Sequence, residues 1–216
     1  MTRARLFAGL SALCNLAVIA AVAWAVARRF SKPEDGGSRF LHGVRGFRFF
    51  TTDSNLLAAL ACLCVLPFSL RGVSGGGYEV PAFARTAKYI GVCAVTLTFL
   101  TVVCFLAPTQ GWLPMFSGPN LWLHLLCPLL CTLSFLLFES QEVIGFPVTF
   151  AALIPIALYG AVYLYAVVVQ ARWEDFYGFN RSGRWYVALP VMLSVSYLIC
   201  LGEWGLSRLL HGVLFQ

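Results

Sequence analysis

The sequence predicts an all-α polytopic membrane protein built as a bundle of six transmembrane helices. Only 11% of its 216 residues are charged and 60% are hydrophobic, whereas roughly a quarter of the residues in a soluble domain are charged. Crossing a hydrocarbon core takes about 20 consecutive apolar residues. Six stretches of about that length carry almost no charge: 6–27, 49–70, 89–108, 119–138, 147–170 and 186–207.

The first stretch, 6–27, follows Arg3 and Arg5 in the manner of a secretory signal peptide. Its uncharged run is longer than the apolar region of about 7–15 residues that such signals contain. We therefore expect it to be the first helix of the bundle.

The connections between the stretches are short or rich in turn-forming and charged residues. The longest, 28–48, contains Lys-Pro-Glu-Asp-Gly-Gly, 71–88 contains three consecutive glycines, and 171–185 is rich in Trp, Tyr and Arg. None is large enough to fold alone, so we expect residues 1–216 to form a single domain. Prolines inside the stretches are expected to kink the helices, and they are Pro67, Pro128, Pro155 and Pro190.

The net charge of +6 and the eight cysteines bear on which kinds of site the chain holds. The basic residues lie in the connections, where such residues contact lipid headgroups and help to set topology, so no nucleic-acid partner is expected. The cysteines all lie inside the apolar stretches and form no Cys-x-x-Cys pair. This pattern argues against a disulfide framework and a zinc site, and we expect neither a metal nor a cofactor.

Polar side chains inside the apolar stretches are the best indicators of function, because they are costly in a membrane. Helical spacing places such residues along one face of the second, fourth and sixth stretches. The second carries Thr51, Ser54, Asn55 and Cys62, the fourth carries Asn120, His124, Cys127, Cys131 and Ser134, and the sixth carries Ser196, Cys200, Glu203 and Ser207.

Thr51 and His124 are the candidate catalytic pair. The even-numbered helices all begin at the same side of the membrane, so both residues are expected at similar depth beneath one surface. There the imidazole can take the hydroxyl proton as the Thr51 oxygen attacks the acyl carbon of a lipid ester. Glu203 is expected roughly 18 Å deeper, near the opposite surface, as a structural polar residue.

Several residues are expected to support this pair. Asn55 and Asn120 each lie one helical turn from a catalytic residue and are candidates to position it or to stabilise an oxyanion. Phe50 and Trp122 offer apolar walls for an acyl chain, and Asp53 completes the predicted site. We expect this site to open sideways to lipid.

Each of these residues also has a structural interpretation. The Thr51-Thr52-Asp53 run is typical of a helix N-terminus, where such side chains satisfy unpaired amide donors. A histidine inside a membrane can have a purely structural role, in which it forms a hydrogen bond between helices. Glu203 can pair with a cation, either Arg208 or one from the connection 71–88.

Three segments resemble a known family, the androgen-induced multi-pass membrane hydrolases and their bacterial relatives. The Phe-Thr-Thr-Asp-Ser-Asn-Leu-Leu run at 50–57 is similar to the Phe-Thr-Ile-Gln-Ser-Asn-Leu-Leu of bacterial members. Residues 120–128, with His124 four residues before a proline, resemble the histidine-bearing helix. Leu-Gly-Glu at 201–203 resembles a segment near the end of the animal proteins, so the likeness extends over about residues 45–208.

The resemblance implies an activity and its residues. Animal members hydrolyse fatty acid esters of hydroxy fatty acids with a threonine and a histidine, which correspond to Thr51 and His124. The chain departs from the animal pattern because its fifth stretch has no histidine. We therefore expect an intramembrane hydrolase of fatty acyl esters, whose partners are its lipid substrate and membrane lipids. The alternatives are a non-catalytic lipid-binding or transport protein and a membrane acyltransferase, and the sequence leaves the oligomeric state open.

Overall fold

The computed structural model describes residues 2–30 and 43–215, so the segment 31–42 of the first connection lies outside the described residues. Six helices are long and apolar enough to cross a membrane, and the predicted six-helix bundle is confirmed. The described residues contain no strand. The first two helices are α1 (Arg3–Phe30) and α2 (Phe50–Val73), with the short η1 (Gly43–Arg48) before α2.

The other four helices are built from consecutive segments. The third combines α3 (Ala82–Thr101), η2 (Val102–Leu106) and α4 (Ala107–Gln110), and α5 (Trp112–Met115) follows it. The fourth combines α6 (Pro119–Leu121), η3 (Trp122–Leu126), α7 (Cys127–Ser134) and η4 (Phe135–Glu139). The fifth is α8 (Val148–Leu164) with η5 (Tyr165–Val169), and η6 (Arg181–Gly183) precedes the sixth, α9 (Trp185–Leu214).

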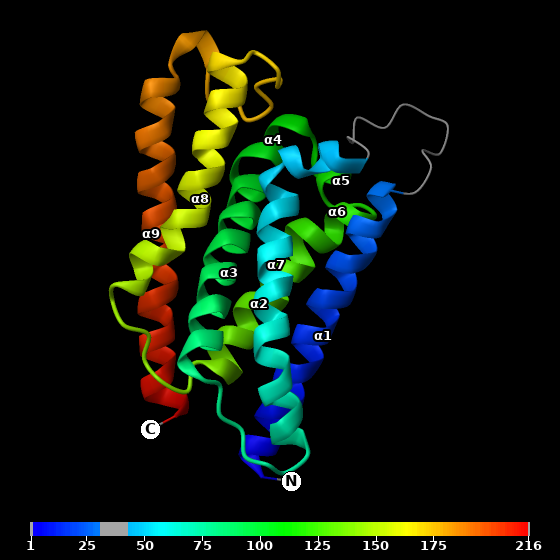
Figure 1. Cartoon of the computed structure of the whole chain (residues 1–216), viewed down its shortest axis with the longest axis vertical. Coiled ribbons are helices and arrows are strands. Elements are labelled where there is room, and N and C mark those ends of the chain that lie inside the picture. The colour runs from blue at the N-terminus through cyan, green and yellow to red at the C-terminus, as the bar shows by residue number, and fades with distance from the viewer. Residues whose placement is uncertain (1, 31–42, 216) are drawn as a thin grey trace.

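Both termini lie at the same end of the bundle, which we call the lower end as drawn in Figure 1. α3 lies at the centre and packs against α2, α7, α8 and α9, while α1 packs against α2 and α7. α8 and α9 form an antiparallel pair along one side (Figure 1). α2 and the fourth helix both begin at the upper end, which places the starts of these two helices at one surface of the bundle.

Small residues allow the central helices to approach closely, as is common in membrane bundles. A Cβ added to Gly91 of α3 would lie 3.0 Å from the Ala58 Cα of α2. The core around this contact joins all six membrane-spanning helices and includes Val18 and Val22 of α1, Cys62 of α2, Val92 of α3 and Phe135 of η4, with Ala152 of α8 and Cys200 of α9. α1 is therefore an integral part of the bundle.

Two helices extend furthest beyond their predicted ends. The third begins at Ala82 instead of residue 89, and the sixth ends at Leu214 instead of residue 207. The extension of the third helix carries Arg85 and Lys88, whose charges are compensated by ion pairs with Glu142 and Glu139. A search of the sequence for uncharged stretches leaves out such residues. It cannot show that they are paired, because their acidic partners come from a distant part of the chain.

Four π-helical segments interrupt or end the described helices: η2, η3, η4 and η5. In η3 the N–H of Cys127 donates to the carbonyl of Trp122, five residues earlier. Pro108 and Pro128, which lack an N–H, closely follow η2 and η3 and disturb the regular α-helical bonding there. Such segments often occur at functional sites, and His124 lies in η3 while Glu139 ends η4.

Candidate functional site

Thr51 lies in the first turn of α2, at the upper end of the bundle. Its side chain lines a small hollow of about 50 Å³, which we call the inner pocket. Residues of α2, α3, η2, α8 and α9 form the walls, together with the connection between η5 and α9. The walls are apolar apart from hydroxyl-bearing side chains, which belong to Thr51, Thr98, Thr101, Tyr159 and Tyr177.

The N-terminus of α2 has no side-chain cap, so capping does not account for Thr51. Phe49 occupies the N-cap position. The neighbouring Thr52 is buried, and its hydroxyl donates to the Gly46 carbonyl at 2.9 Å, which ties α2 to η1. The side chain of Thr51 therefore does not cap α2 and lines the inner pocket.

Asn55 joins the two helices that carry the candidate pair. Its amide nitrogen donates to the carbonyl of Thr51 at 2.7 Å and to that of Leu123 at 3.0 Å. Both amide protons are thereby used, so Asn55 positions the backbone in this arrangement and does not serve as an oxyanion donor. Its Oδ1 is buried without a hydrogen-bond partner, which leaves one acceptor unsatisfied beside the site.

His124 follows Leu123 in the π-helical segment η3 and is buried. Its Nδ1 lies 2.8 Å from the carbonyl oxygen of Met115. Because a carbonyl only accepts, Nδ1 carries a proton, and in the neutral imidazole Nε2 is then the unprotonated nitrogen. This is the tautomer that a general base acting through Nε2 requires, and α5 sets it through Met115.

The remaining predicted site residues surround this region. The amide nitrogen of Asn120 donates to the Pro114 carbonyl at 3.0 Å. This hydrogen bond links α5 to the start of the fourth helix. Trp122 packs against the main apolar core. Phe50 lines the inner pocket beside Thr51, whereas Asp53 lines a neighbouring groove. Asn120 and Trp122 therefore support the scaffold and do not line the pocket.

The structure brings Thr51 and His124 to the same end of the bundle without joining them directly. Thr51 lines the inner pocket and His124 does not. The hydrogen bonds among the described residues include none between the two side chains, and the link runs through Asn55 to Leu123, the residue before His124. Hydrogen bonds between catalytic groups often tighten only when substrate binds.

Tyr177 is a pocket residue that sequence reasoning missed. The Phe50 N–H donates to its hydroxyl oxygen at 3.1 Å. The Tyr177 hydroxyl also pairs with that of Tyr159, whose own proton is donated to the Arg48 carbonyl. Burial raises the pKa of Tyr177 to about 12, so the hydroxyl stays protonated at neutral pH. Tyr177 lies outside the apolar stretches, in a connection with many aromatic residues, and no spacing in the sequence distinguishes it.

Glu203 lies at mid-depth, and the prediction that it sits near the opposite surface is wrong. Its Oε1 accepts from the Thr96 hydroxyl at 2.9 Å, and Thr96 is midway along the third helix. The error arose because α9 continues to Leu214, beyond the predicted end. Arg208, a predicted partner, instead stacks over the ring of Trp204 at 4.9 Å.

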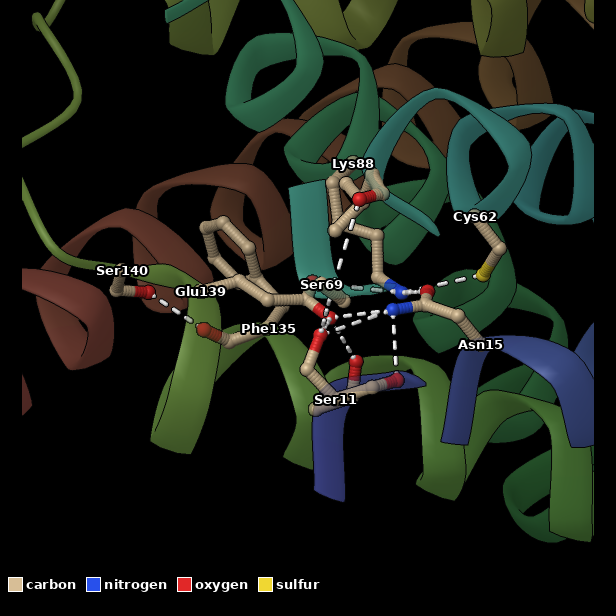
Figure 2. A network of polar contacts seen from close by, with 10 residues as sticks. Ser11, Asn15, Cys62, Ser69, Lys88, Phe135, Glu139 and Ser140 are labelled. Atoms are coloured by element: carbon tan, nitrogen blue, oxygen red, sulfur yellow. Dashed lines mark hydrogen bonds and ion pairs between the residues drawn. The ribbon is translucent and has the colours of Figure 1, made fainter. Parts of the chain in front are cut away.

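A second polar cluster, absent from the sequence prediction, involves Lys88 and Glu139 (Figure 2). Lys88 lies near the start of α3 and Glu139 at the end of the fourth helix, and both of these lie at the lower end of the bundle (Figure 1). Lys88 Nζ lies 3.5 Å from Glu139 Oε2, and neither side chain has any exposed surface. Lys88 also donates to Asn15 Oδ1 and to Cys62 Sγ. We call the cluster the lower network, and its members are Ser11, Asn15, Cys62, Ser69, Lys88, Ser134 and Glu139.

Glu139 is the centre of the lower network. Its Oε1 accepts from Ser11 Oγ at 2.7 Å, Asn15 Nδ2 at 2.7 Å and Ser134 Oγ at 2.6 Å. These donors come from α1 and α7, while Lys88 comes from α3, so the carboxylate ties three helices together (Figure 2). Buried charges are tolerated when they are paired and hydrogen-bonded, and this cluster meets both conditions.

Neither a metal site nor a disulfide occurs in the part of the chain that the structure describes. No group of three His, Cys, Asp or Glu side chains is placed to hold a metal ion there. All eight cysteines are free thiols. No protein-family model matches the chain, and neither a curated protein nor a solved structure matches it.

Proposed function

We propose that this chain is an integral, multi-pass membrane protein that hydrolyses fatty acyl esters of lipids at Thr51. The observation that carries the proposal is the Thr51 hydroxyl in the wall of an apolar pocket, within a helix long and apolar enough to cross a membrane. A site that is mostly apolar, with few polar groups, suits a lipid ester. The tautomer of His124 supports the same proposal.

In the proposed reaction the Thr51 oxygen attacks the acyl carbon of the ester while Nε2 of His124 takes the hydroxyl proton. The tetrahedral intermediate then expels the alcohol oxygen, which receives that proton from the imidazole. This leaves an acyl-threonine. A water molecule, deprotonated by His124, attacks the acyl carbon, and release of the fatty acid returns the proton to Thr51. An alcohol in place of that water would make the reaction an acyl transfer.

The oxyanion needs a donor within the inner pocket, and Tyr177 is the candidate. The donors of Asn55 and Asn120 are directed at backbone carbonyls. Tyr177 lines the pocket with Thr51, and its hydroxyl oxygen already accepts from Phe50. Tyr159, with which Tyr177 shares its proton, lines the same pocket, so this proton can turn from Tyr159 to the oxygen of the tetrahedral intermediate. The family resemblance supports a fatty acyl ester as the substrate, because the animal members that this chain resembles hydrolyse fatty acid esters of hydroxy fatty acids.

The test is turnover of a fluorogenic long-chain ester by the purified protein in mixed micelles. Thr51→Ala and His124→Asn should each lower kcat by about 10²-fold or more, and the double variant should be little worse than either single variant. Asn is a matched replacement because its amide can still donate to the Met115 carbonyl while it lacks a base. Full turnover in folded Thr51→Ala would refute the assignment.

A second candidate function is lipid binding without turnover. It is favoured by the larger apolar groove beside the inner pocket. An acyl-directed hydrolase probe distinguishes the two. Covalent labelling of the wild-type protein at Thr51 supports hydrolysis, whereas lipid binding that Thr51→Ala and His124→Asn both leave unchanged, with no labelling, supports a binding protein.

A further inference from the structure

The inner pocket is too small for an acyl chain. A hollow of about 50 Å³ accommodates only a few water-sized groups, so it has room for an ester carbonyl and little more. The rest of a lipid must lie elsewhere. A second hollow of about 280 Å³, which we call the lateral groove, adjoins the pocket between α2 and α8.

Two aromatic side chains separate the lateral groove from the inner pocket. Phe50 and Tyr159 line both hollows, and their ring centroids are 4.9 Å apart. The Tyr159 hydroxyl donates to the Arg48 carbonyl at 2.7 Å, which holds its ring beside the start of α2. The two hollows are therefore neighbours with a shared aromatic wall, and a chain in the groove lies directly beside the Thr51 pocket.

The lateral groove opens toward the lipid side of the bundle. Its α8 rim includes Leu158 and Val162, which are 62% and 55% exposed. α8 is apolar enough to cross a membrane, so these exposed side chains face hydrocarbon at that depth. A groove of this kind, lined by Leu57 on the α2 side, suits one acyl chain.

The upper end of the groove carries a positive charge. Trp173 lines the groove, and the Arg48 guanidinium lies 5.6 Å from the centre of its ring. Arginine forms strong bidentate hydrogen bonds with phosphate, and tryptophan prefers the membrane interface. An anionic group is therefore favoured at the Arg48 end of the groove, beside Trp173.

The positions of these groups match the layout of one lipid class. Arg48 ends η1 and Thr51 lies in the first turn of α2, with only Phe49 and Phe50 between them in the chain, and the ester groups of a glycerophospholipid lie just below its phosphate. We propose that the lateral groove holds one acyl chain of an ester-linked phospholipid, with the phosphate at Arg48 and the chain entering from the bilayer past Leu158. This deepens and rests on the proposed function, because it names the ester presented to Thr51.

The experiment uses the full-length protein in vesicles that contain a phosphatidylglycerol with a photoreactive diazirine in one acyl chain. The comparison probe is a diacylglycerol with the same chain and no phosphate. After illumination, mass spectrometry should place the phosphatidylglycerol label on α2 and α8 residues of the groove. The diacylglycerol probe should label them about tenfold less, the loss expected from one charge-assisted contact.

Two matched pairs of variants test the route and the headgroup contact. Leu158→Trp should fill the groove and reduce labelling several-fold. Ile154→Trp, on an exposed position one turn away that does not line the groove, should not change it. Arg48→Gln should lower phosphatidylglycerol labelling to the diacylglycerol level. Arg45→Gln should have little effect, because the Arg48 guanidinium contacts the Trp173 ring of the groove and Arg45 is an exposed arginine of η1.

Equal labelling in Leu158→Trp and Ile154→Trp, or labelling spread evenly over the lipid-facing helices, would overturn the groove as the chain site. Equal labelling by the two probes would overturn the phosphate contact. Thr51→Ala separates this inference from the proposed hydrolysis. Groove labelling that persists in Thr51→Ala supports the binding site whatever the outcome of the turnover assay, and loss of turnover without loss of labelling supports both proposals.

Discussion

The upper site and the lower network are both polar clusters inside apolar helices, but their polar groups are used differently. In the upper site the Thr51 side chain faces a pocket and Asn55 Oδ1 has no hydrogen-bond partner. In the lower network Glu139 Oε1 accepts three hydrogen bonds, while its Oε2 accepts none but lies 3.5 Å from Lys88 Nζ, and both side chains are fully buried. Polar groups directed at a hollow are available for a ligand, whereas groups directed at one another hold helices together. Depth in the membrane alone does not distinguish the two roles.

The largest expected effect concerns stability and the lower network. Lys88→Met or Glu139→Leu alone leaves a buried charge without its partner, which should lower the free energy of unfolding by about 3–5 kcal/mol. Thermal unfolding in detergent measures this loss. Turnover per folded molecule should change little, because Thr51 begins α2 at the upper end, whereas Lys88 lies near the start of α3 and Glu139 at the end of η4, both at the lower end.

The double variant Lys88→Met/Glu139→Leu sharpens the same test. Removing both charges should recover a large part of the stability that either single variant loses. A double variant as unstable as the singles would mean that Ser11, Asn15 and Ser134, rather than the charge pair, determine the stability of this half of the bundle.

The next effect is on catalysis and belongs to the upper site. Tyr177→Phe removes the proposed oxyanion donor, so kcat for the ester should fall by about 10²-fold, with only a small fall in melting temperature. Tyr163→Phe is the control, because its hydroxyl donates to Asp175 at 2.9 Å and does not line the inner pocket. Equal losses of kcat in the two variants would indicate that Tyr177 acts only through the fold of its connection.

The smallest effect is expected between the two clusters, at Glu203. Glu203→Gln keeps an oxygen that can accept from Thr96, so the free energy of unfolding should fall by no more than about 1 kcal/mol. Turnover should remain at the wild-type level, since Glu203 contacts the middle of the third helix and not the inner pocket. Loss of turnover with an unchanged melting temperature would place Glu203 in the catalytic machinery.

The sequence was sufficient for the helices and for the end of the bundle at which the predicted pair lies. Apolar stretches of membrane-spanning length report helices directly, and Thr51 and His124 each lie near the start of their stretch. It was insufficient for Lys88 and Glu139, because a charge at the edge of a stretch looks like a loop residue until its partner is known. Tyr177 required the tertiary structure, since its role depends on where a connection folds over α2.

The π-helical turn of η3 affects how the fourth helix contributes residues to both the upper site and the lower network. A π turn holds one more residue than an α turn, so the helix beyond it is rotated by about 100° relative to an uninterrupted α-helix. His124 lies within η3 and Ser134 lies beyond it. His124 contacts Met115 and Ser134 contacts Glu139. The angle between these two side chains around the helix axis is therefore set by the one additional residue. Deleting Leu125 or Leu126 of η3 would turn one cluster away from its partners, although every residue of both clusters would still be present.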